Sequence, residues 1–225
     1  SSWGEGMEPP ASMTMSYDDG RIMQDPRQFW DDRYAEADFA YGCEPNDFLA
    51  EQAQGLPAGD ALCLAEGQGR NGIHLAALGH RVQVQDLSPV GLERALALAQ
   101  QRGVTIETIC CDLDSFEPEP QSTDLVVAIW MHLPPALRAR VHQQAVRALR
   151  PGGHLILEAY TPGQLELGTG GPPQRDLLIT ADDLRQELAG LDWIVLEERQ
   201  RQIKEGPYHH GPSAVIQALG RKPTD

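Results

Sequence analysis

The stretch that decides the fold is Ala61-Leu62-Cys63-Leu64-Ala65-Glu66-Gly67-Gln68-Gly69-Arg70-Asn71. Its apolar half, 61–65, predicts a buried strand, and the glycines after it predict a tight turn into a helix over 71–78. A second apolar segment over 82–85 then ends at Asp86. A strand, a helix and another strand in succession indicate a βαβ unit with parallel strands, so the stretch predicts an α/β protein.

The same alternation continues along the chain. Further strands are expected at 105–109, 124–130 and 154–159, and helices from Ser88 to Gly103, Pro134 to Arg150 and Thr180 to Gly190. The last two strands, 193–199 and 214–219, have no helix between them, which predicts an antiparallel hairpin at one edge of a doubly wound sheet. We expect one domain over 25–222, with a helical cap over 25–54 and a flexible tail over 1–24.

Charge and composition limit the partners. The 225 residues include 18 Lys and Arg and 33 Asp and Glu, so the formal net charge is −15. This field repels nucleic acids and anionic membranes and favours a cationic ligand. The longest apolar run, Leu125 to Met131, is far too short to cross a bilayer, and no leader pattern is seen. The four cysteines have no metal-binding or disulfide spacing, so we expect reduced thiols in a cytoplasmic protein.

Acidic side chains follow three of the predicted strands, where doubly wound sheets bind their ligands. Glu66, Asp86 and Asp112 stand at these carboxyl ends. Asp86 lies 20 positions after Glu66, where a carboxylate accepts both hydroxyls of a ribose. Asp112 is placed to accept from the amine of an adenine, and Gly67 and Gly69 let the backbone approach a ligand. The pattern predicts an adenosyl ligand.

Two adenosyl ligands fit this pattern. Gly67, Gly69 and Gly72 satisfy the GxGxxG spacing of dinucleotide-binding proteins, so an NAD-dependent oxidoreductase stays open. Glu66 argues against it, because its carboxylate would repel the pyrophosphate by about 1 kcal/mol at 4 Å in water. S-adenosylmethionine (SAM) carries a sulfonium and an ammonium, which Glu66 would attract. A SAM-binding protein without turnover is a third possibility.

Four segments carry a resemblance to a known family: Phe29-Trp30-Asp31-Asp32-Arg33-Tyr34, Gly67-Gln68-Gly69-Arg70-Asn71, Gly79-His80-Arg81-Val82-Gln83-Val84-Gln85-Asp86-Leu87-Ser88 and Leu149-Arg150-Pro151-Gly152-Gly153. With them the chain resembles class I SAM-dependent methyltransferases, most closely the branch of tellurite, thiopurine and thiol or halide methyltransferases. The resemblance implies a Rossmann-like, mostly parallel seven-stranded sheet with an antiparallel last strand. It also implies SAM as cofactor and S-adenosylhomocysteine as product.

The resemblance assigns the ribose to Asp86, the adenine to Asp112 and Leu113, and the methionine part to the glycine loop. This sequence departs from the family in that loop, with Cys63 in place of the usual acid and Ala65 in place of the first glycine. Glu66 is expected to take over the role of the acid. The predicted cofactor-binding residues are Trp30, Arg33, Glu66, Gly67, Gly69, Asn71, Asp86, Leu87, Asp112 and Leu113.

Three residues are candidates for the chemistry. His132 is a candidate base for a small-molecule acceptor, such as a thiol or another soft nucleophile, or else a histidine that caps the next helix. Trp130 is a candidate wall of the methyl pocket or plain core, and Tyr208 a substrate contact or part of a polar turn. Arg33 is expected to pair with the methionine carboxylate or with nearby surface acids.

The segment 161–179 is rich in glycine and proline and leaves the carboxyl end of a predicted strand. Its length without periodicity favours a substrate lid, with a mobile surface loop as the alternative. His209 and His210 lack a third ligand nearby, so no metal site is predicted.

Overall fold

The computed structural model describes residues 17–18, 21–22, 25–36 and 39–225. Most of the predicted tail, 1–24, lies outside these residues, although Tyr17–Asp18 (β1) and Arg21–Ile22 (β2) form an antiparallel pair. The other elements are α1 (Pro26–Ala35), α2 (Asp47–Ala53), β3 (Asp60–Leu64), α3 (Arg70–Ala77), β4 (Arg81–Asp86), α4 (Pro89–Arg102), β5 (Glu107–Cys110), β6 (Thr123–Ile129), α5 (Pro135–Ala148), β7 (Leu149–Tyr160), the 3-10 helices η2 (Pro162–Glu166) and η3 (Arg175–Leu177), α6 (Ala181–Glu187), β8 (Asp192–Glu205) and β9 (His209–Arg221).

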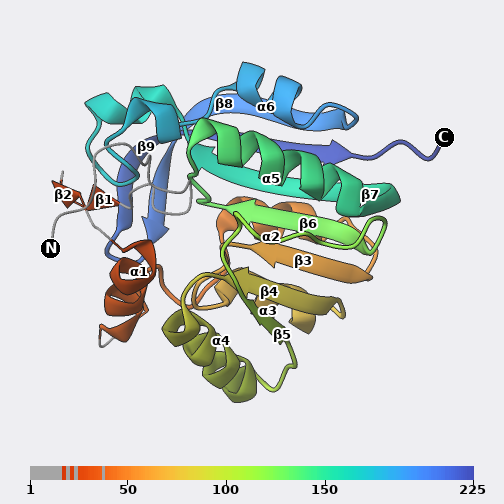
Figure 1. Cartoon of the computed structure of the whole chain (residues 1–225), viewed down its shortest axis with the longest axis horizontal. Coiled ribbons are helices and arrows are strands. Elements are labelled where there is room, and N and C mark those ends of the chain that lie inside the picture. The colour runs from red at the N-terminus through yellow and green to blue at the C-terminus, as the bar shows by residue number, and fades with distance from the viewer. Residues whose placement is uncertain (1–16, 19–20, 23–24, 37–38) are drawn as a thin grey trace, which may run out of the picture.

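Seven strands form one sheet in the order β5-β4-β3-β6-β7-β9-β8. The neighbours from β5 to β7 pair in parallel, and β9 runs antiparallel to both β7 and β8. This confirms the doubly wound, mostly parallel seven-stranded sheet with an antiparallel last strand. The carboxyl ends of the parallel strands meet at one edge, on the left of Figure 1, beside α1 and the turn between β8 and β9.

Helices cover both faces of the sheet because the central strands alternate between two cores. Ala61 and Cys63 of β3 pack with α2, α3 and α4. Leu62 and Leu64 of the same strand pack with α5 and α6 on the other face. Strands that are apolar on both faces are typical of parallel sheets covered on both sides.

Local capping signals place several helices as predicted. Ser88 Oγ accepts from Gly91 N at 3.0 Å before α4, and Gly103 ends that helix in a left-handed conformation with φ of 69°. Thr180 and Asp183 form the expected capping box at α6.

The predicted boundaries of the last helices and strands along the chain, from α5 onward, are partly wrong. β7 begins at Leu149, so the Pro151-Gly152-Gly153 stretch lies inside a strand, and α5 ends at Ala148. The hairpin strands are about twice as long as expected. β8 is an edge strand with mostly exposed, charged side chains, so it has no apolar alternation to extend the prediction.

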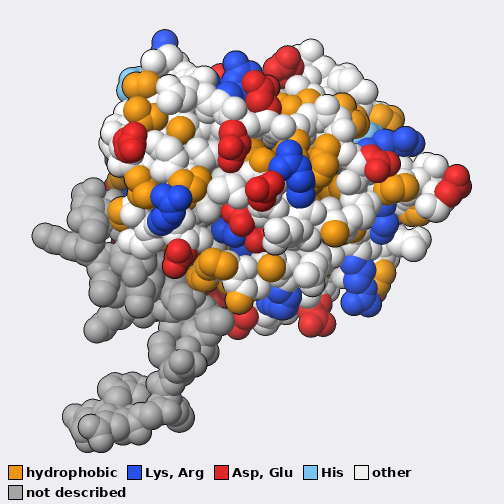
Figure 2. Space-filling view, turned by 90° about the horizontal axis from the view of Figure 1, so that it is seen from above, with side chains coloured by type: hydrophobic (Ala, Val, Ile, Leu, Met, Phe, Trp, Pro, Cys, Tyr) orange, Lys and Arg blue, Asp and Glu red, His pale blue; other side chains and the backbone are white. Residues whose placement is uncertain are grey.

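No helix among the described residues combines the length and apolar composition needed to cross a bilayer. On the face toward α6 and β8, Figure 2 shows acidic and basic side chains interspersed with small apolar groups and no continuous basic area.

A buried ionic network joins the helical cap to the sheet. Glu158 of β7 is fully buried, and its carboxylate accepts from Arg201 Nε at 3.0 Å, Asn46 Nδ2 at 2.8 Å and Gln217 Nε2 at 2.6 Å. Asn46 also donates to Glu205 at 2.7 Å. Asn46 is the N-cap residue of α2, so these contacts hold the start of α2 against the β8–β9 hairpin.

Arg201→Leu should destabilise the fold by about 3–5 kcal/mol, because it leaves the Glu158 carboxylate buried without its cation. Arg185→Leu is the control, since Arg185 forms an exposed pair with Asp182 that is worth about 0.5 kcal/mol or less. Urea unfolding measures both. Adding Glu158→Gln to Arg201→Leu should recover part of the loss, and equal effects of the two single variants would contradict the role given to the network.

Candidate active site

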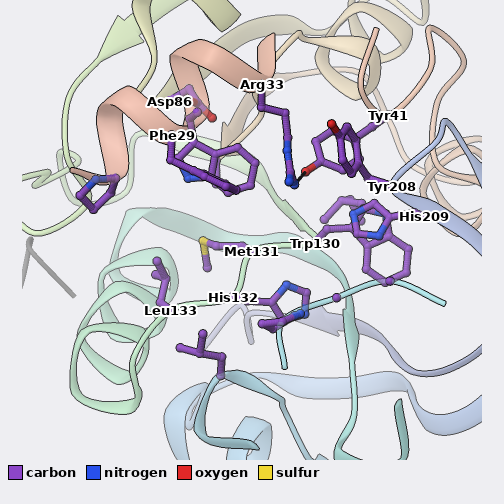
Figure 3. Close-up of a pocket in the computed structure, with 18 of the residues that line it drawn as sticks. Phe29, Arg33, Tyr41, Asp86, Trp130, Met131, His132, Leu133, Tyr208 and His209 are labelled. Atoms are coloured by element: carbon purple, nitrogen blue, oxygen red, sulfur yellow. Dashed lines mark hydrogen bonds between the residues drawn. The ribbon is translucent and has the colours of Figure 1, made fainter. Parts of the chain in front are cut away.

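A pocket of about 740 Å³ opens at the carboxyl ends of the parallel strands. Its walls come from α1, from the ends of β3 to β6, from the segment 161–179 and from the β8–β9 turn. Figure 3 shows Phe29 on one side and Tyr41, Tyr208, Trp130 and His209 on the other, with Arg33 between them. Glu66, Asp86 and Asp112 all line it, so the three predicted carboxylates share one cavity.

Glu66 has a structural role that sequence reasoning missed. Its Oε1 accepts from Asn71 N at 2.9 Å and Gly72 N at 3.3 Å, at the start of α3. The N-cap residue itself is Gly69, which has no side chain to do this. Burial raises the pKa of Glu66 to about 7, against the opposing effect of Arg70. The carboxylate therefore caps α3 and presents a costly buried charge to the pocket.

The two loop glycines are needed for packing within the protein. Gly67 has φ of +60°, and a Cβ there would lie 2.4 Å from Tyr34 Oη. Gly69 has φ of +85°, and its Cβ would lie 2.6 Å from the Cβ of Ala95 in α4. Neither glycine lines the pocket, so the close approach they permit is to α1 and α4.

Asp86 is held at the end of β4 by backbone donors. Its Oδ2 accepts from Gly67 N at 2.8 Å and its Oδ1 from Ser88 N at 2.9 Å. Burial raises the pKa of Asp86 to about 6, and the nearby Asp31 adds to the rise. The Leu87 backbone N–H also donates to this carboxylate, which retains acceptor capacity for one further ligand hydroxyl.

The remaining cofactor candidates surround these acids. Asp112 Oδ1 accepts from Asp114 N at 2.9 Å, which turns the chain after β5, and Leu87 and Leu113 line the pocket beside it. Asn71 also lines the pocket, and its Oδ1 accepts from Asn46 N at 2.8 Å. This hydrogen bond joins the start of α3 to the N-cap residue of α2.

Helix α1 covers the glycine loop with aromatic side chains. Trp30 stacks on Tyr34 at 5.6 Å between ring centroids. The Arg33 guanidinium lies 3.8 Å from the centroid of the Tyr208 ring and donates to Tyr41 Oη at 3.3 Å. Asp31 accepts from the Ser88 hydroxyl, which fixes α1 to the start of α4.

Trp130 and His132 follow β6 and lie on the pocket wall. Trp130 has φ of +55°, and its Nε1 donates to Glu205 Oε2 at 2.5 Å. His132 Nε2 accepts from Tyr160 N at 3.0 Å. Burial lowers the pKa of His132 to about 4, so the ring is neutral near pH 7. A neutral imidazole has one acceptor nitrogen, and this contact uses it.

The β8–β9 turn brings Tyr208 and His209 to the same wall. Tyr208 Oη donates to Glu36 at 2.9 Å. His209 Nδ1 lies 2.6 Å from Tyr160 Oη, and its ring stacks on Tyr41 at 4.7 Å. Burial holds the pKa of His209 well below its usual range. Tyr160 and Glu205, which position these groups, have no sequence signal because both lie beyond the ends of the predicted strands, 154–159 and 193–199.

The segment 161–179 borders the pocket through Gln164, Leu165 and the stretch 168–173. The Gln164 amide is fully engaged, since Nε2 donates to Thr169 Oγ1 and Gly170 O and Oε1 accepts from Ala214 N. The segment contains two short 3-10 helices, which the sequence did not predict.

Residues 61–153 match the family model described as "Methyltransferase domain". This segment, which is less than half of the chain, is therefore similar to a methyltransferase domain. It contains β3 to β6 and the first part of β7 of the seven-stranded sheet, and the cofactor that the match indicates is SAM. The branch within this class stays a prediction.

Known proteins with similar sequences are methyltransferases. "N-terminal Xaa-Pro-Lys N-methyltransferase 1" of Rattus norvegicus is 28% identical over 133 residues, which are 57% of this chain and 58% of that protein. "2-heptyl-1-hydroxyquinolin-4(1H)-one methyltransferase" of Mycobacteroides abscessus is 26% identical over 53% of this chain and 54% of that protein. The chain thus matches little more than half the length of these relatives.

The fold is also similar to that of solved methyltransferases. The N-methyltransferase NodS from Bradyrhizobium japonicum, solved in complex with S-adenosylhomocysteine, has a TM-score of 0.64 at 18% identity, over 88% of this chain and 98% of NodS. At this identity the likeness concerns the fold.

Gly67→Ala should lower both stability and affinity for SAM, because the new methyl group displaces Tyr34 in addition to straining φ. Gly103→Ala is a matched control with φ of +69° and nothing within 4 Å of the added atom. The control isolates the backbone cost of about 1–2 kcal/mol. Thermal unfolding and titration with SAM measure both variants. If Gly67→Ala costs no more than Gly103→Ala, the packing of Tyr34 on this glycine is not needed.

Proposed function

We propose that the protein is a SAM-dependent methyltransferase that acts on a small-molecule nucleophile by in-line displacement. The observation that carries this is the meeting of Glu66, Asp86 and Asp112 in one pocket, next to a wall formed by Trp130 and Tyr208. SAM, when bound, supplies an electrophilic methyl group on a sulfonium. The contribution of the protein is to bind, orient and exclude water.

The described residues fit this cofactor. Asp86 retains acceptor capacity for a ribose hydroxyl, and Leu87, Asp112 and Leu113 would surround the adenine. Glu66 and Asn71 would face the methionine part, with Trp30 and Arg33 over it. Two buried carboxyl groups with raised pKa values would gain from a cation beside them, which supports a sulfonium and ammonium ligand.

The NAD alternative fits less well. A dinucleotide needs the free amides at the N-terminus of the first helix for its pyrophosphate. Here Glu66 Oε1 already accepts from two of those amides, at Asn71 and Gly72. A pyrophosphate would have to displace a carboxylate of its own charge.

A small molecule is favoured over a protein substrate by the enclosure of the pocket. The segment 161–179, the β8–β9 turn and α1 all contribute walls. We propose that 161–179 acts as the substrate lid. The known relatives differ on this point, since one is named for a protein N-terminus and the other for a quinolinone.

SAM binding should release protons at pH 6, and the release should become smaller as the pH rises through 7. The pKa of Glu66 is about 7 and that of Asp86 about 6, so both are partly protonated at pH 6, and a nearby cation lowers both values. Affinity should therefore rise between pH 5 and about pH 7. Calorimetry in buffers of different ionisation enthalpy measures the release.

Asp86→Asn should weaken SAM binding by about 10- to 100-fold and reduce the release, while Asp192→Asn, on exposed β8, should change neither. Proton uptake on binding at pH 6, or tight binding of NADH in place of SAM, would rule out the proposed function.

His209 is better placed than His132 to accept a proton from the methyl acceptor. The acceptor nitrogen of His132 is bonded to Tyr160 N, so we propose His132 as a positioning residue. Nε2 of His209 has no partner among the described residues, and its ring lines the pocket. In the tautomer whose Nδ1–H donates to Tyr160 Oη, the Nε2 lone pair is available for a thiol or hydroxyl proton, and the lowered pKa of His209 keeps the ring neutral before the acceptor binds.

His209→Gln should lower kcat/KM by about 100-fold for an acceptor that is protonated at the assay pH. It should have little effect on an acceptor that is already ionised, because no proton then has to be removed. The neighbouring His210→Gln is the control, since His210 is exposed. Rates over a series of phenols of different pKa measure the difference. An equal loss across the series would indicate a structural role for His209.

A further inference from the structure

The formal charges of the pocket are confined to one part of it. Glu66, Asp86 and Asp112 surround the proposed cofactor region, with Arg70 beside them. The rest, here named the acceptor half, is lined from 130–137, 164–177 and 207–209. None of the side chains that line the pocket from these three segments is Asp, Glu, Lys or Arg.

Arg33 is the charged group at the border between the two parts. Its guanidinium lies over the Tyr208 ring at 3.8 Å and the Phe29 ring at 4.6 Å, and it donates to Tyr41. Figure 3 shows it between Phe29 and Tyr41. A positive group at this point opposes a cationic acceptor such as a peptide amine.

One wall of the acceptor half is aromatic. The His209 ring stacks on the Tyr41 ring, and its centroid lies 5.0 Å from that of Trp130. The ring centroids of Tyr41 and Tyr208 are 5.9 Å apart. Trp130 is itself held in place by stacking on Tyr160 at 4.6 Å and by its hydrogen bond to Glu205. A rigid wall of ring faces and edges is suited to a flat ring.

Aliphatic side chains also line the acceptor half. They are Met131, Leu133, Pro172 and Pro173, and the Gln164 amide is already satisfied within the protein. A charged acceptor would lose its hydration here without gaining an ionic partner, which is strongly unfavourable. A flat apolar molecule loses little hydration free energy on entering this half and can stack on its aromatic side chains.

We propose that the methyl acceptor is an uncharged, planar aromatic molecule whose ring lies against the aromatic wall of the acceptor half. The proposal rests on the proposed function, since it names the substrate class of the same pocket. It restricts the acceptor to a neutral ring that carries the nucleophile.

The test uses thiols with the same CH2–SH nucleophile and different bodies. Phenylmethanethiol and naphthalen-2-ylmethanethiol carry flat rings, cyclohexylmethanethiol is the saturated match, and 4-(mercaptomethyl)benzoate and 4-(aminomethyl)phenylmethanethiol add charges of either sign. Binding to the full chain is measured by calorimetry with S-adenosylhomocysteine present, so that no methyl transfer is needed. The flat neutral thiols should bind at least tenfold more tightly than the saturated and the charged ones.

Tyr208→Leu and Tyr208→Phe form a matched pair for the aromatic wall. Tyr208→Leu should reduce the preference for phenylmethanethiol over cyclohexylmethanethiol, and Tyr208→Phe, which keeps the ring, should retain it. Because the readout is a ratio of affinities, a general loss of folding does not produce it.

Tighter binding of a charged thiol, equal binding of the flat and saturated rings, or no binding of either flat thiol would overturn the proposal. Methyl transfer from labelled SAM to the same thiols is measured separately. Absence of transfer with the expected order of binding would reject the proposed function and leave the ligand class standing.

Discussion

The arrangement of the site depends on a buried pair of carboxylates behind it. Glu158 and Glu205 both accept from Asn46, and Glu205 also accepts from Trp130 Nε1 and lies 3.4 Å from Arg70 Nη1. These contacts connect α2, the glycine loop, the end of β6 and the hairpin. A buried carboxylate must be paired or solvated, so the elements that carry its partners are held at fixed distances. Trp130 and Arg70, which contact Glu205, also line the pocket, so this cluster helps to fix the shape of the pocket.

The same constraint explains the left-handed conformation of Trp130. A bulky residue at φ of +55° is strained, and it persists only where its surroundings fix it. Stacking on Tyr160 and the bond to Glu205 provide that fixation. The strained backbone turns the indole into the pocket wall directly after a buried strand.

Much of the fold and part of the site follow from the sequence. The βαβ alternation places Glu66, Asp86 and Asp112 at one sheet edge whatever the details of packing, so their meeting could be predicted. The side-chain contacts behind these carboxylates could not be predicted. Asn46, Tyr160 and Glu205 come from segments that are far apart in the sequence and are brought to this region only by the fold. The glycines illustrate the limit: the pattern predicts their unusual backbone, and only the structure reveals that Tyr34 and Ala95 fill the space.

The two buried carboxyl groups of the pocket, Glu66 and Asp86, affect the stability of the fold and its dependence on pH. The pKa values of Glu66 and Asp86 are raised in the folded state, so each group contributes stability below its unfolded pKa, near 4, that is lost as pH rises through about 7 and about 6. At neutral pH the fold therefore holds at least one poorly solvated carboxylate, and a bound cation relieves that cost. Among the described residues that line the pocket, the carboxylates lie where a cation would bind, and the proposed acceptor half has no formally charged side chain. A cofactor with a positive charge and an apolar acceptor would together complement such a pocket.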